Sequence, residues 1–176
     1  VIEFALKQPL IASIDQCNDT LDNIVGMISI KDLILLDSAD LSLIKRAKLL
    51  YVDWYDGDYI VRAMEEAKRH NVPVFLNFEH GHTHPDLLKK YSGMVTVCQA
   101  VTDAAQIGKK QAMLGVARKL IKSGIETAII TMASQGCLAV QGDEIIRAFA
   151  PRVKAVDASG AGATFSSGFI FGYLKG

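Results

Sequence analysis

The chain has 176 residues, of which 50% are hydrophobic and 22% are charged. This length predicts one domain with a buried core, and the composition is ordinary for a globular protein. The 19 Lys and Arg residues balance the 19 Asp and Glu residues. The chain therefore has no net charge that would attract nucleic acid or an anionic membrane. The longest apolar runs are too short to span a bilayer, and no secretory signal is recognisable at the start.

The cysteines indicate a reducing compartment. Cys17, Cys98 and Cys137 are odd in number and widely spaced, which fits neither a disulfide framework nor a metal-ligand pattern. We expect buried thiols in a cytoplasmic protein.

From about Leu41 onward, short apolar runs alternate with amphipathic segments. The pattern predicts strands over 49–53, 72–76, 94–98 and 126–132, a hairpin over 138–140 and 145–149, and helices over 58–70, from Pro85 and over 111–123. Asp40 is expected to cap a short helix before the first strand, and Gly124 to end the last helix. Such an alternation predicts an α/β fold, with a mainly parallel sheet that has helices on both faces. Ligands bind beyond the carboxyl ends of the strands in such sheets.

We expect one α/β domain over residues 1–176, in which residues 1–40 have no clear assignment and residues 41–176 form the readable core. The chain begins at Val1 and stops at Gly176, directly after an apolar helix-like segment. Both ends therefore suggest part of a larger domain.

The most informative segment is glycine-rich and covers residues 156–172. A strand-like Arg152–Val156 leads into small residues, and an apolar helix is expected from about Ala161. Small residues at a helix start leave the backbone N–H groups uncovered, and the helix dipole adds positive potential there. The segment therefore predicts an anion site, with phosphate as the obvious occupant.

Two common phosphate motifs fit this segment poorly. A P-loop requires Gly-Lys-Ser/Thr at its end, which does not follow Gly162. A dinucleotide fingerprint requires a small residue where this chain has Phe165, and it belongs near the first strand of its unit.

A family signature fits better. Asp157-Ala-Ser-Gly-Ala-Gly-Ala-Thr-Phe165 resembles the Asp-Thr-x-Gly-Ala-Gly-Asp-x-Phe motif of the ribokinase-like (PfkB) carbohydrate kinases. Upstream, residues 128–140 resemble that family's strand, Thr-x-Gly-x-x-Gly turn and strand. The resemblance covers roughly residues 49–176 and implies a three-layer α/β/α fold, of which this chain holds only a part.

The resemblance also implies roles for individual residues. The amides of Gly160, Ala161 and Gly162 would stabilise charge on the transferring phosphoryl group. Thr131 and Gly136 would line the nucleotide, and Asp157 would hold the entry of the loop. From the residues alone, the glycines could instead form a tight strand-to-helix turn without a ligand, Thr131 and Gly136 a plain hairpin turn, and Asp157 a helix cap.

The position of the family's catalytic base is occupied by Ala163. A methyl group cannot accept a proton, and general-base catalysis contributes about 10²–10⁴-fold. Ala163 is therefore either an engineered knock-out or the mark of a natural pseudokinase. Ala133 and Ala158, which also depart from the family pattern, slightly favour natural drift.

The resemblance implies ATP and Mg²⁺ as cofactors. The family's Asn-x-x-Glu motif for magnesium should follow the strand over 94–98, and Gln99 and Asp103 are the candidates there. Their spacing departs from the motif by one residue, although Mg²⁺ needs few protein oxygens.

Two other groups of residues have an ordinary interpretation beside a functional one. His80, His82, His84 and Asp86 include possible zinc ligands, but alternate histidines after a strand more often form a solvated loop. Glu79 is either a surface residue or a contact of substrate or metal-bound water. Residues 54–56 follow a strand end, where they could stack on a sugar. Packing in the core is the stronger interpretation, because Trp54 has a large apolar ring.

The sequence therefore predicts ATP-dependent phosphoryl transfer to a hydroxyl of a sugar or sugar-like molecule, impaired by Ala163. The alternative is a non-catalytic pseudokinase that binds nucleotide or sugar. A third hypothesis is a different α/β nucleotide-binding enzyme. Expected partners are a small-molecule sugar and ATP, and a homodimer is possible because lids of this family often mediate dimers.

Overall fold

The computed structural model describes residues 40–54, 59–101, 109–154, 156–157 and 160–176. Its strands and long helices belong to the unit formed by residues 44–176. The strands are β1 (Leu50–Asp53), β2 (Val74–Glu79), β3 (Val97–Val101), β4 (Thr127–Thr131), β5 (Cys137–Gln141) and β6 (Glu144–Ala148). The helices are α5 (Tyr59–Arg69), α6 (Pro85–Tyr91), α7 (Lys110–Lys122) and α8 (Ala161–Tyr173), with 3-10 turns η2 (Leu41–Arg46), η4 (Gly81–Thr83), η5 (Ser92–Met94) and η7 (Ala133–Gln135).

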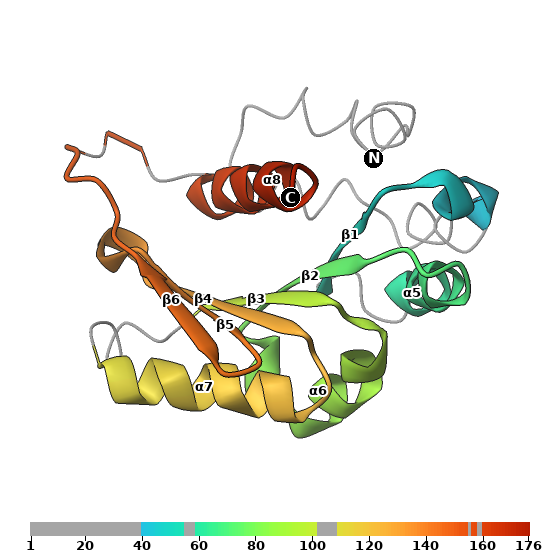
Figure 1. Cartoon of the computed structure of the whole chain (residues 1–176), viewed down its shortest axis with the longest axis horizontal. Helices are drawn as coiled ribbons and strands as arrows, with labels where there is room; N and C mark the ends of the chain where they lie inside the picture. Colours follow the sequence, from blue (N-terminus) through green and yellow to red (C-terminus); the bar gives the residue numbers. More distant parts are fainter. Residues whose placement is uncertain (1–39, 55–58, 102–108, 155, 158–159) are drawn as a thin grey trace, which may run out of the picture. The chain divides into compact units, whose positions relative to one another are not determined.

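The six strands form a single sheet in the order β1-β2-β3-β4-β5-β6. The pairs from β1 to β4 are parallel, and the pairs β4–β5 and β5–β6 are antiparallel. Helices α5, α6 and α7 cover one face, and α8 lies on the other (Figure 1). The predicted α/β class, with a mainly parallel sheet and helices on both faces, is confirmed, and so is the predicted hairpin of β5 and β6.

An apolar core lies between the sheet and α8. Four buried apolar residues, Leu49 just before β1 and Phe75, Val97 and Ile129 of the sheet, form the core here, and Phe165, Phe169 and Ile170 of α8 pack against them. The rings of Phe75 and Phe169 lie 5.9 Å apart between centroids. Because residues two apart on a strand share a face, the apolar positions of adjacent strands meet beneath the helix.

Several predicted boundaries differ from the observed ones. β3 begins at Val97 rather than Met94, because η5 occupies Ser92–Met94. β2 continues to Glu79 and β3 to Val101, so Asn77 and Gln99 lie within strands. The strand expected over Arg152–Val156 is wrong: residues 151–154 carry no regular structure and are exposed. Pro151 cannot donate to a ladder, and no apolar partner covers Val153, which is 76% exposed.

The helix ends follow the sequence signals where these are described. The amide of Ser42 donates to Oδ1 of Asp40 at 2.9 Å, as expected for the cap of η2. Pro85 occupies the first turn of α6, where its missing N–H removes no helical bond.

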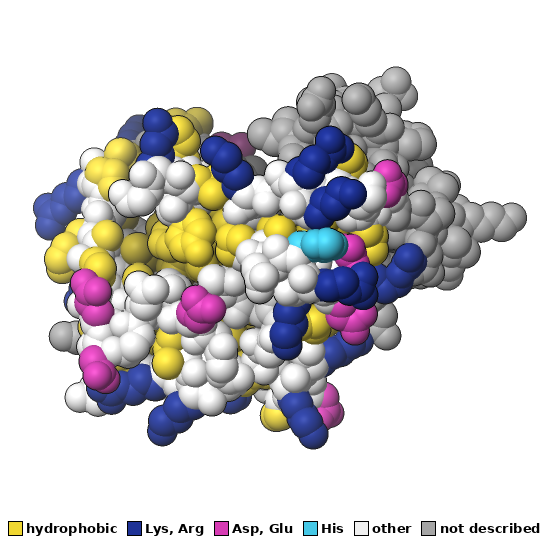
Figure 2. Space-filling view, turned by 45° about the vertical axis from the view of Figure 1, so that its right-hand side comes forward, with side chains coloured by type: hydrophobic (Ala, Val, Ile, Leu, Met, Phe, Trp, Pro, Cys, Tyr) yellow, Lys and Arg dark blue, Asp and Glu magenta, His cyan; other side chains and the backbone are white. Residues whose placement is uncertain are grey.

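The surface of the described residues carries charges of both signs. Figure 2 shows Lys and Arg interspersed with Asp and Glu on one face, with hydrophobic side chains exposed between them. None of the described helices is both long and apolar enough to cross a membrane.

A close approach of backbone and ring makes Gly81 sensitive to substitution. A Cβ atom at Gly81 would overlap the ring of Phe78, which is fully buried, whereas one at Gly93 would meet nothing within 4 Å. We expect Gly81→Ala to lower the free energy of unfolding by about 1–3 kcal/mol, measured by urea denaturation. Gly93→Ala is the matched control, and an equal loss in both variants would contradict the overlap.

Candidate functional site

The site begins at the N-terminus of α8. Gly160 precedes the helix with φ 74° and ψ 2°, in the left-handed region that glycine adopts readily. The first helical bond runs from the amide of Thr164 to the carbonyl of Gly160, at 2.9 Å. The amides of residues 161–163 therefore precede the internal bonds of the helix. Residues 160–163 are all exposed, so the described protein leaves this turn uncovered.

A buried serine joins this turn to the sheet. Oγ of Ser166, one turn into α8, donates to Oε1 of Gln99 on β3 at 2.8 Å. The same oxygen lies 3.0 Å from the carbonyl oxygen of Gly162. Ser166 and Gln99 are each 2% exposed, so these bonds are shielded from water.

The polar contacts continue across three adjacent strands. Asp53, Asn77 and Gln99 are partners in the register of β1, β2 and β3. Nδ2 of Asn77 donates to Oδ2 of Asp53 at 2.8 Å, and Nε2 of Gln99 approaches Oδ1 of Asn77 at 3.5 Å. Nδ2 of Asn77 also lies 3.4 Å from Oε1 of Glu79. Four side chains, Asp53, Asn77, Gln99 and Ser166, thus form a polar row from β1 to α8.

Tyr51 lies beside this row. Burial and the neighbouring Asp53 carboxylate raise the pKa of the Tyr51 hydroxyl, while hydrogen bonds with Ser166 and Asn77 act in the opposite direction. Its ring stacks on Phe75, with centroids 5.7 Å apart. Tyr51 therefore contacts both the polar row, through its hydroxyl, and the apolar core, through its ring.

The turn predicted to line the nucleotide lies at the carboxyl end of β4. Thr131 ends β4, and its Oγ1 donates to the carbonyl of Ala100 at 3.3 Å. The amide of Met132 donates to the carbonyl of Gly136 at 2.9 Å and closes the turn around η7. This turn and the start of α8 lie at the same end of the sheet (Figure 1). Asp157 is exposed in the segment that leads to α8.

Of the two residues predicted for magnesium, Gln99 is described and Asp103 is not. Gln99 is buried, and its two polar side-chain atoms contact Ser166 and Asn77. Asp103 lies outside the described residues, as do Ala158 and Cys17. In the part of the chain that is described, no group of three His, Cys, Asp or Glu side chains could hold a metal ion. Gln99 therefore does not fit the role of an open magnesium ligand.

His80, His84 and Asp86 are exposed, as expected for a solvated segment, and only His82 among these four residues departs from that expectation. His82 is buried, and its Nε2 lies 3.1 Å from the carbonyl oxygen of Val101. The carbonyl of His82 in turn accepts from Nζ of Lys119 on α7, at 3.0 Å. This histidine therefore fastens η4 to β3 and α7.

Two other candidate contacts of substrate have described positions. Trp54 packs edge-on against Phe78, with centroids 6.3 Å apart, as expected for core packing. Glu79 is half-buried at the end of β2, with φ 43°. Tyr55 and Asp56 lie outside the described residues.

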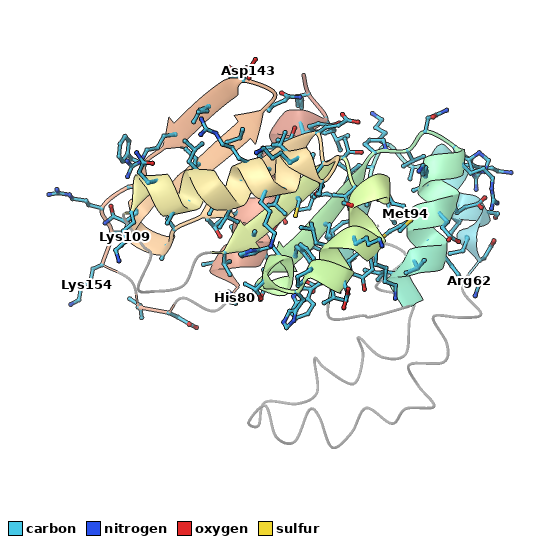
Figure 3. The ribbon with its side chains drawn as sticks, turned by 90° about the horizontal axis from the view of Figure 1, so that it is seen from below. Arg62, His80, Met94, Lys109, Asp143 and Lys154 are labelled. Carbon is cyan, nitrogen blue, oxygen red and sulfur yellow. The ribbon has the colours of Figure 1, made fainter. Side chains whose placement is uncertain are left out.

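Sequence reasoning missed part of the site. Ser166, Asn77 and Asp53 had no predicted role, although a polar residue inside an otherwise apolar strand or helix is a usable signal. Lys109 and Lys154 were also missed; both are exposed and lie toward the end of the sheet where α7 begins (Figure 3). Their positive charge suits the anion expected at this end.

A mainly parallel α/β sheet with an uncovered, glycine-rich helix start beyond its strand ends is an arrangement in which α/β proteins bind phosphate groups. The sequence model of the pfkB family carbohydrate kinases matches residues 26–176. The chain belongs to this family.

Individual relatives agree with the family. Over 60 residues the chain is 40% identical to an uncharacterized sugar kinase of Archaeoglobus fulgidus, covering 34% of this chain and 24% of the relative. Over 121 residues it is 28% identical to the ATP-dependent 6-phosphofructokinase of Thermoanaerobacterium thermosaccharolyticum, covering 64% and 38%. The chain thus spans well under half the length of these relatives.

The fold is that of ribokinase-like structures. The structure of Arabidopsis thaliana ribokinase complexed with ribose and ATP matches with a TM-score of 0.64 and 21% identity. The match covers 78% of this chain and 46% of that one. The predicted ribokinase-like fold, incomplete relative to its neighbours, is confirmed.

Proposed function

We propose that this chain supplies the phosphate-binding part of a kinase that transfers a phosphoryl group from ATP to a hydroxyl of a sugar or sugar-like small molecule. The observation that carries the proposal is the first turn of α8, whose amides at residues 161–163 precede the internal helix bonds and belong to exposed residues. The relatives named as sugar kinase and 6-phosphofructokinase support the substrate class.

In this proposal, Gly160, Ala161 and Gly162 present preorganised donors to the charge that develops on the transferring phosphoryl group. Phosphoryl transfer depends mainly on such positioning and electrostatic stabilisation. Thr131 and Gly136 border the nucleotide, and Asp157 holds the approach to the turn. The family implies Mg²⁺ with the ATP; because Gln99 does not fit as its ligand, no step is assigned to the ion.

Ala163 limits the proposed activity. Its exposed methyl group cannot accept a proton from the sugar hydroxyl. The nearby side chains of Thr164 and Ser167 in α8 carry only hydroxyls, so neither can act as the base in its place. We propose impaired transfer, with a pseudokinase that binds ATP or sugar without turnover as the second candidate. A cytoplasmic location and a homodimer remain predictions.

Binding of ATP tests the phosphate role of the turn. A side chain at Gly162 or at Gly168 would meet no atom within 4 Å of its Cβ, so both glycines of α8 can be replaced without a clash. We expect Gly162→Leu to weaken ATP binding at least about tenfold, because the new side chain covers the amides and each tenfold is about 1.4 kcal/mol. Isothermal titration calorimetry measures the change.

Gly168→Leu is the matched control, since it adds the same side chain to the same helix two turns away from the proposed phosphate. We expect it to bind ATP as the unchanged chain does. Equal binding by the Gly162→Leu variant, or no ATP binding by the unchanged chain, would refute the phosphate role.

A further inference from the structure

Ser166 contacts both the proposed phosphate-binding turn and the sheet. Its single hydroxyl proton lies between two acceptors, Oε1 of Gln99 at 2.8 Å and the carbonyl oxygen of Gly162 at 3.0 Å. Gly162 belongs to the exposed first turn of α8, whose amides precede the internal helix bonds. The hydroxyl therefore connects the position of that turn with a side chain of β3.

The other contacts between α8 and the sheet cannot fix the rotation of the helix as closely. Phe165, Phe169 and Ile170 are only partly buried against the sheet, and apolar burial is non-directional. A buried hydrogen bond requires a defined distance and angle, and leaving its polar groups unpaired is costly. The hydrogen bonds of Ser166, with Gln99 on β3 and with Tyr51 on β1, are therefore the directional contacts.

Gln99 is itself held in place by its neighbours. Its Nε2 faces Asn77, which donates to Asp53, and the three residues are register partners on adjacent parallel strands. Because the backbone ladder fixes their spacing, the polar row is a rigid reference for whatever bonds to Gln99.

We propose that Ser166 is a positioning residue, which through Gln99 orients the first turn of α8 so that its amides point at the phosphoryl group. This inference rests on the proposed function. Ser166 touches neither phosphate nor sugar; it acts through the carbonyl of Gly162 and the turn that carries it.

Ser167 provides a closely matched control. Its Oγ donates to the carbonyl of Ala163 at 2.9 Å, the same bond to the fourth preceding residue that Ser166 makes with Gly162. Ser167 is exposed. Replacing either serine by alanine thus removes one such bond, but only Ser166→Ala also removes the link to β3.

The experiment compares the unchanged chain with Ser166→Ala, Gln99→Met, their double variant and Ser167→Ala. ADP affinity is measured by calorimetry, and the rigidity of the Gly162 amide without nucleotide by heteronuclear NOE. We expect Ser166→Ala and Gln99→Met each to weaken ADP binding about fivefold, the effect of one lost hydrogen bond. The double variant should lose no more than Ser166→Ala alone, because Ser166→Ala has already removed the contact that Gln99→Met breaks.

We expect the Gly162 amide to become more mobile in Ser166→Ala and Gln99→Met, and to stay as it is in Ser167→Ala. If Ser167→Ala has the same effects, or if the losses of the two single variants add in full, the positioning role is wrong. If the unchanged chain does not bind ADP, the proposed function fails; the amide measurement then still decides whether Ser166 orders the turn.

Discussion

Replacing Gly136 by alanine should lower the free energy of unfolding by about 2–6 kcal/mol. A Cβ atom there would overlap the carbonyl oxygen of Ala148 and lie 2.8 Å from the amide nitrogen of Ala150. Gly136 also has φ 87°, which costs a residue with a side chain about 1–3 kcal/mol. Both penalties fall on backbone groups, so no side chain can move aside to relieve them.

The loss is large beside the stability of ordinary domains, which is about 5–15 kcal/mol. In a chain of this size each kcal/mol moves the melting temperature by about 2–4 °C, so we expect a drop of about 5–20 °C. Circular dichroism during heating and urea titration measures both quantities.

Gly142 supplies the control in the neighbouring hairpin. It also has a positive φ, 56°, but a Cβ there would meet nothing within 4 Å. Gly142→Ala should therefore cost only the backbone penalty, about 1–2 kcal/mol. Equal losses in the two variants would show that the contact with Ala148 contributes nothing. In that case only the positive φ angle would require glycine at position 136.

The sequence predicted the secondary structure well wherever hydrophobic periodicity decides it. The i, i+3, i+4, i+7 spacing in residues 58–70 corresponds to α5, and the apolar runs correspond to the buried strands. It failed for Arg152–Val156, where three apolar residues beside a proline resembled a strand. Whether such a segment pairs depends on a partner strand with a free edge and on burial of Val153, neither of which local sequence contains.

The glycine-rich turn could be predicted because its chemistry is local. Small residues before an apolar helix produce uncovered amides whatever the rest of the fold does, and α8 begins at Ala161 as expected. The polar row could not be predicted, because it requires the register that places Asp53, Asn77 and Gln99 side by side. The predicted strands 72–76 and 94–98 lie two or three residues before the observed ones. The prediction therefore placed Asn77 and Gln99 just past the ends of their strands.

The same error explains the prediction for Gln99. A residue just past a strand is free to face a ligand, whereas one inside a strand alternates with its neighbours between the two faces of the sheet. Gln99 faces α8 and contacts Ser166 there. Its side chain therefore serves the packing of the helix rather than an open metal site.

Restoring a carboxylate at position 163 should raise the rate of ATP-dependent sugar phosphorylation by about 10²–10⁴-fold, the usual contribution of a general base. Residue 163 is exposed in the first turn of α8, so Ala163→Asp places its carboxylate beside the amides proposed to hold the phosphoryl group. The nearby helix N-terminus favours negative charge by about 0.3–1 kcal/mol. The variant should therefore fold at least as well as the unchanged chain.

Ala163→Asn is the matched control, because it has the size and polarity of aspartate without a basic oxygen. The full-length gene product carrying each substitution is assayed with ATP and a panel of sugars. We expect kcat to rise in the aspartate variant alone, since proton removal acts in the transition state rather than in ATP binding. A rise in both variants would show that polarity, rather than proton transfer, limits the reaction.

The assay also separates the two proposed functions, provided that ATP affinity is measured in the same samples. If Ala163→Asp binds ATP but phosphorylates no sugar in the panel, the missing base is not what silences the protein, and the pseudokinase is favoured. If the aspartate variant turns over, the Gly160–Gly162 turn, the nucleotide and the acceptor hydroxyl must already be aligned in the unchanged protein. A single added carboxylate supplies a proton acceptor but cannot assemble a site, so turnover would mean that only the base is absent.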